Sequence, residues 1–172
     1  MRNNKAKTVA YMGLMLAVAL TLSFLERMVP PLPMLPPGVS LGLSNIVTMY
    51  CVFFIGARWA FGIAALKSAF VVMTRGPVAG CLSLCGGILS LIVIVILLKI
   101  FGRRMSYIAA GICGAVAHNI GQLSMASLLL GTKVFFYLPA LIVSGVVMGA
   151  VTGTTLSVLL PIFHKLFGQV RD

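Results

Sequence analysis

Long apolar runs, interrupted by short breaks that contain glycine, proline or basic residues, make up almost the whole chain. A helix rises about 1.5 Å per residue, so it needs roughly 20 apolar residues to cross a hydrocarbon core about 30 Å thick. The runs are continuous and rich in Leu, Ala and Met, whereas the strands of a membrane β-barrel alternate apolar and polar residues. We therefore predict six membrane-spanning helices, at residues 8–25, 41–56, 59–74, 81–101, 107–130 and 135–167.

Three of these runs depart from the ideal length for a single crossing. The runs at 41–56 and 59–74 are short, so we expect one of them to be tilted, broken or partly re-entrant. The run at 135–167 is too long, and Pro161 is expected to separate the span from an interfacial tail.

The composition agrees with a chain whose main solvent is lipid. Of the 172 residues, 60% are hydrophobic and only 9% are charged, whereas a soluble domain has about 25% charged residues. Backbone groups within lipid must be hydrogen-bonded internally, which a helix achieves within one segment. We predict an all-α integral membrane protein of the cell membrane, a single domain over residues 1–172 that forms a six-transmembrane-helix bundle and has no soluble catalytic domain.

Basic residues gather on one side of this arrangement. With the N-terminus in the cytoplasm, nine Lys and Arg residues fall on the cytoplasmic side and three, Arg27, Arg75 and Lys133, fall outside. Cytoplasmic loops are enriched in Lys and Arg, so we predict that both termini are cytoplasmic. The formal charge of +11 is then explained by basic residues that set the orientation in the membrane and attract anionic lipid headgroups. Nucleic acid is excluded as a partner because the chain has no soluble basic module.

Small residues recur every four positions on the first, fifth and sixth predicted helices. Gly13 and Ala17 form one smooth face of the first helix, and Gly145, Gly149 and Gly153 form another on the sixth. Such rows let helix backbones approach closely in lipid. We expect the sixth-helix row to pack within the protein, whereas the first-helix face suits either internal packing or contact with another protein.

The cysteines do not form a metal-binding or redox pattern. All four lie in or at the ends of apolar runs, and Cys81 and Cys85 are four residues apart rather than in a C-x-x-C arrangement. We expect them to be packing residues, and we expect no disulfide, metal site or cofactor.

Several strongly polar residues fall within the apolar runs, where a charge near the bilayer centre costs about 2.5–3.5 kcal/mol even on permissive scales. Polar residues kept at such a cost are candidates for function. Lys67 lies in the middle of the third predicted helix, and Arg75 directly follows that helix, two turns beyond Lys67 toward the outside. The other polar residues within the runs are Asn45, His118, Asn119 and Gln122. The spacing of the last three puts them around one face of the fifth helix.

If these residues share one cavity, the cavity is cationic and suits a phosphate or carboxylate group. The only acidic residues are Glu26 and Asp172, so little is left to bind a cation or relay protons. Two alternatives to a shared cavity stay open. Lys67 could extend to the membrane interface, and the His118 group could form hydrogen bonds between helices without a ligand.

A proline-rich loop at residues 26–40 follows the first predicted helix. It begins at Glu26 and includes Pro33, Pro36 and Gly38, with five prolines in all before that glycine. Such a segment is stiff, extended and unable to form a helix. On the outside, where the predicted topology puts it, the loop is either a lid over an external cavity or a rigid connector.

Five segments of the chain together carry a resemblance to a known family. They are Glu26 with the proline-rich loop, G-V-S-L-G-L-S-N at 38–45, A-L-K-S at 65–68, S-L-C-G-G at 83–87 and G-A-V-A-H-N-I-G-Q at 114–122. Over nearly its whole length the chain resembles the Gx transporter family, also described as heptaprenyl diphosphate synthase component I. That family is similar in size and six-helix plan to the substrate-binding S components of energy-coupling factor (ECF) transporters.

The similarity to S components implies a membrane subunit that captures a vitamin-like small molecule from outside. Residues 26–40 would be the lid, and Gly13 and Ala17 would dock on a transmembrane coupling subunit that works with two ATPases. This chain has Gly13 where the docking pattern of S components has Ala. No G-x-x-x-x-G-K-[ST] segment is present, so the energy for transport would come from such partners.

The heptaprenyl description implies another role. Prenyl synthases hold magnesium on the diphosphate with aspartate-rich motifs, and the single Asp of this chain is Asp172. We therefore expect the chain alone not to be an enzyme. Our first hypothesis is the substrate-binding membrane subunit of a transport system for a small anionic or amphipathic vitamin- or isoprenoid-related molecule. The alternative is a non-catalytic membrane accessory subunit of heptaprenyl diphosphate or quinone-precursor synthesis, which would bind a soluble prenyl synthase.

Overall fold

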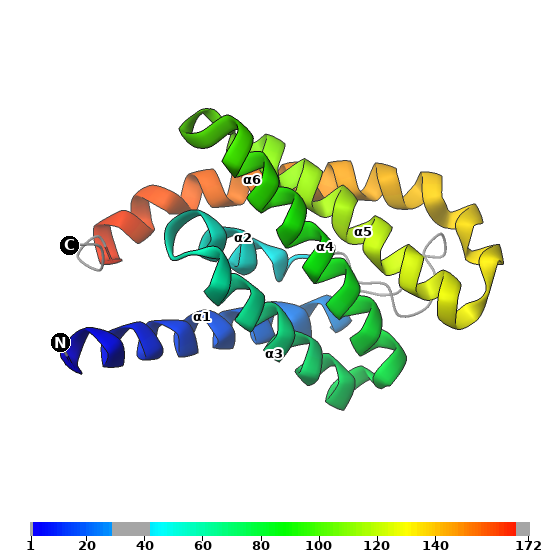
Figure 1. Ribbon diagram of the computed structural model, residues 1–172, viewed down its shortest axis with the longest axis horizontal. Coiled ribbons are helices and arrows are strands. Elements are labelled where there is room, and N and C mark those ends of the chain that lie inside the picture. Colours follow the sequence, from blue (N-terminus) through cyan, green and yellow to red (C-terminus); the bar gives the residue numbers. More distant parts are fainter. Residues whose placement is uncertain (1, 29–41, 168–172) are drawn as a thin grey trace.

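The residues that the structure describes, 2–28 and 42–167, form helices and turns and contain no strand. In this computed structural model the helices pack side by side in one bundle (Figure 1). The long helices are α1 (Arg2–Met28), α3 (Ala57–Arg75), α4 (Pro77–Phe101), α5 (Tyr107–Leu130) and α6 (Leu138–Phe167). The shorter elements are α2 (Asn45–Phe54) and the 3-10 helices η1 (Gly102–Arg104) and η2 (Thr132–Tyr137).

Five helices in the described part of the chain are long and apolar enough to cross a membrane. The predicted spans at 8–25, 59–74, 81–101 and 107–130 lie within α1, α3, α4 and α5. The last span differs from the prediction because α6 continues through Pro161 to Phe167, so this proline does not end the helix.

The second predicted span, at 41–56, is corrected by the structure. Helix α2 has 10 residues and is therefore about 15 Å long, roughly half of the hydrocarbon thickness. The helix cannot extend further back because the chain turns at Gly42, whose φ of 87° lies in the left-handed region that favours glycine. The six-span count is thus not confirmed, and of the two short runs the earlier one is the broken one.

The short length of α2 fixes the depth at which it begins. Gly56 joins α2 to α3 with a φ of 128°, so the two helices run in opposite directions from one turn. Asn45 lies nine residues before the end of α2, and Lys67 lies ten residues after the start of α3. Both residues are therefore about 15 Å from the turn, and the N-terminus of α2 opens in the middle of the bundle next to Lys67.

Glycines bring α5 and α6 into backbone contact. A Cβ atom added to Gly149 would lie 2.5 Å from Cα of Ile112, and one added to Gly153 would lie 2.5 Å from Cα of Ile108. Both distances are too short for any side chain, so the two helices pack backbone to backbone. The prediction that the sixth-helix glycines pack within the protein is confirmed at these positions.

Helix α1 has one buried and one exposed face. Met12, Met15, Ala19 and Ser23 are buried against the bundle. Gly13 and Ala17 are exposed, and a Cβ atom added to Gly13 would meet nothing within 4 Å. The small-residue face of the first helix thus points away from the other helices.

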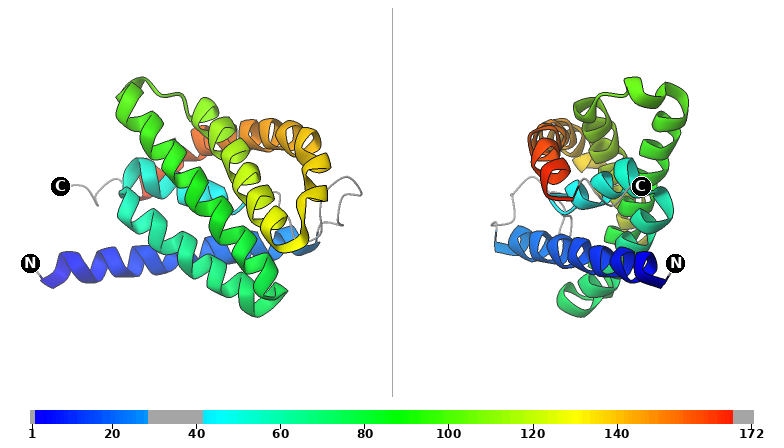
Figure 2. Two further views of the ribbon diagram at one scale, coloured as in Figure 1. Left: turned by 45° about the vertical axis from the view of Figure 1, so that its right-hand side comes forward. Right: turned by 90° about the vertical axis from the view of Figure 1, so that its left-hand side faces the viewer.

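The two ends of the chain lie on one side of the bundle. Figures 1 and 2 show that α1 begins and α6 ends on the side that also carries the α2–α3 and α4–α5 turns. Arg58, Lys99 and Arg104 are exposed near these turns. The assignment of this side to the cytoplasm stays a prediction from the distribution of basic residues.

Candidate functional site

Lys67 is the centre of a polar cluster inside the apolar bundle. Its side chain is only 3% exposed, although it carries an ammonium group. The Nζ atom donates hydrogen bonds to Oγ of Ser44 at 3.1 Å and to Oδ1 of Asn45 at 3.0 Å. Lys67 therefore stays inside the bundle and binds the first residues of α2 rather than extending to an interface, which brings two of the predicted site residues together.

Glu26 lies on the other side of the same serine. The backbone N–H of Ser44 donates to Oε1 of Glu26 at 3.2 Å, and Glu26 is 8% exposed. Its second oxygen, Oε2, is buried and has no hydrogen-bond partner among the described residues. Among the described side chains, Lys67 and Arg75 are cations that act on this carboxylate.

This position corrects two expectations drawn from the sequence. Glu26 belongs to helix α1 rather than to the predicted loop at 26–40, because the helix continues to Met28. The cluster is also not purely cationic, because a buried carboxylate faces Lys67 across Ser44. A glutamate at the end of an apolar run gives no sign in the sequence of whether its side chain points into the bundle or toward water.

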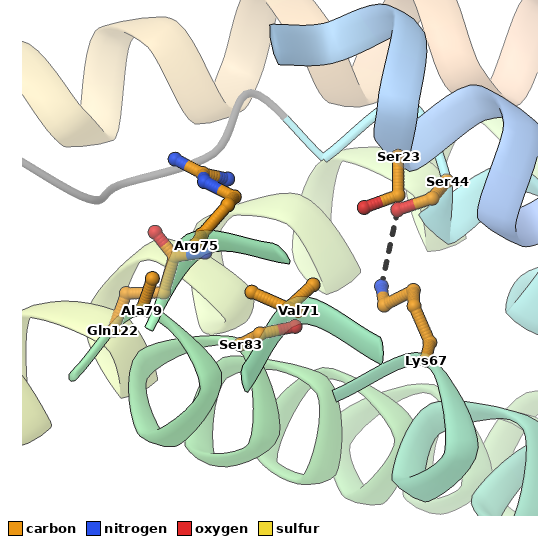
Figure 3. A pocket seen from close by; sticks show the side chains of 8 residues that line it. All are labelled: Ser23, Ser44, Lys67, Val71, Arg75, Ala79, Ser83 and Gln122. Carbon is orange, nitrogen blue, oxygen red and sulfur yellow. Dashed lines mark hydrogen bonds between the residues drawn. The ribbon is translucent and has the colours of Figure 1, made fainter. Parts of the chain in front are cut away.

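A small pocket opens beside this cluster between α1, α3, α4 and α5. Figure 3 shows Ser23 and Ser44 facing Lys67, with Arg75 at the far end of the pocket. Arg75 is two turns beyond Lys67 on α3, which is about 12 Å along the helix, and is partly exposed. The lining residues are Ser23, Ser44, Lys67, Val71, Arg75, Ala79, Ser83 and Gln122.

His118 and Gln122 approach the pocket from α5. Nε2 of Gln122 lies 2.7 Å from Nε2 of His118, and each side chain is 1% exposed. The pair packs against Gly86 of α4, where an added Cβ atom would lie 2.8 Å from Cγ of Gln122 and 2.9 Å from Cε1 of His118. His118 thus positions Gln122, which lines the pocket.

Asn119 is directed to another part of the bundle. Its Nδ2 atom donates to the backbone oxygen of Leu141 at 2.7 Å and to Oγ of Ser144 at 3.4 Å, both on α6. Neighbouring residues on a helix point about 100° apart, so Asn119 faces α6 while His118 faces α4. The structure therefore brings Asn45, Lys67, Arg75, His118 and Gln122 to the pocket region, and places Asn119 at the α5–α6 contact.

The Asn119→Leu variant is expected to be less stable while keeping its ligand affinity. It removes two hydrogen bonds between helices, and such a bond is worth about 0.6–1.7 kcal/mol in a membrane protein. The midpoint of thermal unfolding in detergent should fall, and the affinity for an anionic ligand that the wild-type protein binds should stay within about twofold of the wild-type value. A large loss of affinity in a folded variant would contradict this assignment and show that Asn119 takes part in ligand binding.

Three polar residues of the pocket were not singled out from the sequence. Ser23, Ser44 and Ser83 line the pocket, yet a serine in an apolar helix commonly bonds its own backbone and so carries little information. Ser68 does this by donating to the backbone oxygen of Ala64 at 2.9 Å. Ser44 had one signal, its place between the turn at Gly42 and the polar Asn45.

The remaining predicted residues lie away from the pocket or outside the described chain. Pro33, Pro36 and Gly38, assigned to a lid, lie outside the described residues. Gly13 and Ala17, assigned to docking, are on the exposed face of α1. The lid and docking roles therefore stay predictions.

The geometry suits the recognition of an anionic group. Among the described residues, the charged groups in and around the pocket are Lys67, Arg75 and Glu26, two positive and one negative in their ordinary states. The N-terminus of α2 adds the partial positive charge of a helix dipole. Apolar helices surround the cluster.

Comparison with known families gave one match. The sequence model described as heptaprenyl diphosphate synthase component I matches residues 15–159, which include every described residue of the pocket. No characterised protein and no solved structure matches the chain.

Proposed function

The chain belongs to the heptaprenyl diphosphate synthase component I family, and from this membership we propose that it is a membrane subunit of prenyl diphosphate synthesis. In this proposal it is not catalytic itself. It binds the diphosphate head of an isoprenoid in the Lys67 pocket while the prenyl chain lies among the apolar helices. A catalytic synthase component is its partner, as the word "component" in the family description implies.

The observation that carries the proposal is the buried ammonium group of Lys67. A charge in this position is costly in a membrane unless it is paired or binds a ligand. Among the described residues its hydrogen bonds reach the neutral oxygens of Ser44 and Asn45, and an ammonium group has a third N–H to donate. A phosphate oxygen is an acceptor that suits this donor.

The same end of the bundle that carries the termini offers a surface for a soluble partner. Arg58, Lys99 and Arg104 are exposed there, and a protein with an acidic face would be attracted to them. If this side is cytoplasmic, a soluble synthase could dock on it and exchange a membrane-bound isoprenoid with the pocket.

Purification in mild detergent from the native membrane tests this proposal. We expect the tagged chain to retain a prenyl synthase component, and mass spectrometry of the retained small molecules to find an isoprenoid diphosphate. The Lys67→Met chain should retain the protein partner but less of the small molecule. Recovery of neither would contradict the proposal.

A second function, the substrate-binding subunit of a transporter, is favoured by the broken second helix. Half-length helices whose N-termini end in the middle of the membrane point at anionic substrates in several transporter folds, and α2 has this arrangement at Asn45. The exposed face of Gly13 and Ala17 would then dock on a coupling subunit. In the same purification, a transmembrane protein with two ATPases in place of a synthase would favour transport.

A further inference from the structure

We propose that Glu26 occupies the place of the ligand's anionic group at the N-terminus of α2, and that binding of an anion displaces this carboxylate. The inference rests on the proposed function, because it concerns how the same pocket accepts a phosphate group. Glu26 would then determine how much negative charge a ligand can bring into the bundle.

The carboxylate sits where donors for an anion converge. The backbone N–H of Ser44 points at Oε1 of Glu26 at 3.2 Å, and the Ser44 side chain makes no capping hydrogen bond at the start of α2. The positive end of the helix dipole and the ammonium group of Lys67 lie next to the same serine. Backbone N–H groups, a helix N-terminus and a lysine are the usual elements of a phosphate site.

Glu26 fills this place incompletely. Its Oε2 atom is buried without a hydrogen-bond partner among the described residues, which is unfavourable for a carboxylate oxygen. Lys67 directs its hydrogen bonds at neutral oxygens of Ser44 and Asn45, and Ser44 separates it from the carboxylate. A carboxylate that is only partly paired is easier to displace than one held by several strong donors.

A bound phosphate and the Glu26 carboxylate would compete for the same surroundings. Both are negative, and two like charges at short range repel strongly where water is largely excluded. A phosphate also offers more acceptor oxygens than a carboxylate, so it could take the Ser44 N–H and the third N–H of Lys67 together. The exchange of one anion for another keeps a negative group near Lys67, and Glu26 must move away or be protonated.

The Glu26→Gln variant tests this role directly, because it keeps the size of the side chain and removes the charge. The Kd of detergent-purified protein for farnesyl diphosphate should become roughly tenfold lower than in the wild type, since the competing charge is gone. Affinity for farnesol, the uncharged analogue, should not change. Ser23→Ala is the matched control, since Ser23 lines the pocket on the same helix but is uncharged, and it should not tighten binding.

A second measurement uses the wild-type chain and does not depend on how the variant folds. Glu26 is the only glutamate, so a hydrophobic carbodiimide that modifies buried carboxyl groups reports on it specifically, with Asp172 as the separate signal in mass spectrometry. Farnesyl diphosphate should increase the rate of modification of Glu26 by several-fold, because the displaced carboxylate becomes more accessible. Farnesol should leave this rate unchanged.

The outcomes separate this inference from the proposed function. If the wild type binds farnesyl diphosphate but Glu26→Gln binds it equally or more weakly, or if the diphosphate slows or does not change the modification of Glu26, the displacement is wrong while the pocket stands. If the wild type and Glu26→Gln both fail to bind farnesyl diphosphate better than farnesol, the proposed function and this inference both fail. Tighter binding by Glu26→Gln together with faster modification supports the displacement.

Discussion

The Lys67→Met variant is expected to bind farnesyl diphosphate roughly ten- to hundredfold more weakly than the wild type. A hydrogen bond to a charged group is worth about 1.5–3 kcal/mol, and this factor follows from its loss. Met keeps most of the length and the apolar stem of Lys67, which is 3% exposed, so the packing of the bundle is retained. The measurement is equilibrium binding to the detergent-purified protein, with thermal unfolding as the test of folding.

Lys133→Met is the matched control for this loss. It removes the same charge from the same residue type, but Lys133 is exposed on η2 and does not line the pocket. Its Kd should equal that of the wild type. A folded Lys67→Met protein with unchanged affinity would assign Lys67 to helix packing alone, with no part in binding a ligand.

Removing the positive charge also changes the balance around Glu26. In Lys67→Met the buried carboxylate keeps its hydrogen bond from Ser44 but loses a nearby cation. A buried charge that loses its partner is destabilising, so some loss of stability is expected together with the loss of affinity. The double variant with Glu26→Gln should recover part of that stability, because neither charge is then left alone.

The sequence predicted the long helices because proline and glycine residues mark where these helices begin and end. Pro77 starts α4 at a position where its missing N–H costs nothing, and glycines at 56, 76, 102 and 131 adopt positive φ angles where helices end. Polar residues deep in apolar runs were likewise visible as candidates, since their cost in lipid depends on position alone.

The sequence could not predict which neighbour each polar side chain faces. His118, Asn119 and Gln122 lie close together on α5, yet α5 packs against α4 on one side and α6 on the other. The first and third residues of this group therefore reach the pocket region, while Asn119 binds α6. The burial of Glu26 could not be predicted for the same reason, because the direction of its side chain depends on how α1 packs against α2 and α3.

The length of α2 could also not be predicted from the neighbouring sequence. The apolar run at 41–56 continues without a charged residue, so nothing in it marks Asn45 as the first helical position. The N-terminus of α2 is instead stabilised by groups from other helices, the carboxylate of Glu26 and the ammonium group of Lys67. Helix ends that are satisfied by tertiary contacts have no sequence signature of their own.

Replacing Gly149 with Val is expected to cause the largest loss of stability among substitutions outside the polar cluster. A Cβ atom at this position would lie 2.5 Å from Cα of Ile112 and 2.6 Å from the backbone oxygen of Gly111. Neither neighbour can move by rotating a side chain, so α6 must separate from α5. Such overpacking costs about 1–3 kcal/mol or more, which lowers the midpoint of thermal unfolding by several degrees.

The separation of α6 from α5 should also weaken the hydrogen bonds of Asn119. Gly145 lies one turn before Gly149, and a Cβ atom added to Gly145 would lie 3.0 Å from Nδ2 of Asn119. Gly62→Val is the matched control. It adds the same side chain to a membrane helix, but Gly62 is exposed and an added Cβ atom would meet nothing within 4 Å. If the two variants unfold at the same temperature, the backbone contact between α5 and α6 does not hold the bundle together, and the cost at Gly149 is only that of placing a β-branched residue in a helix.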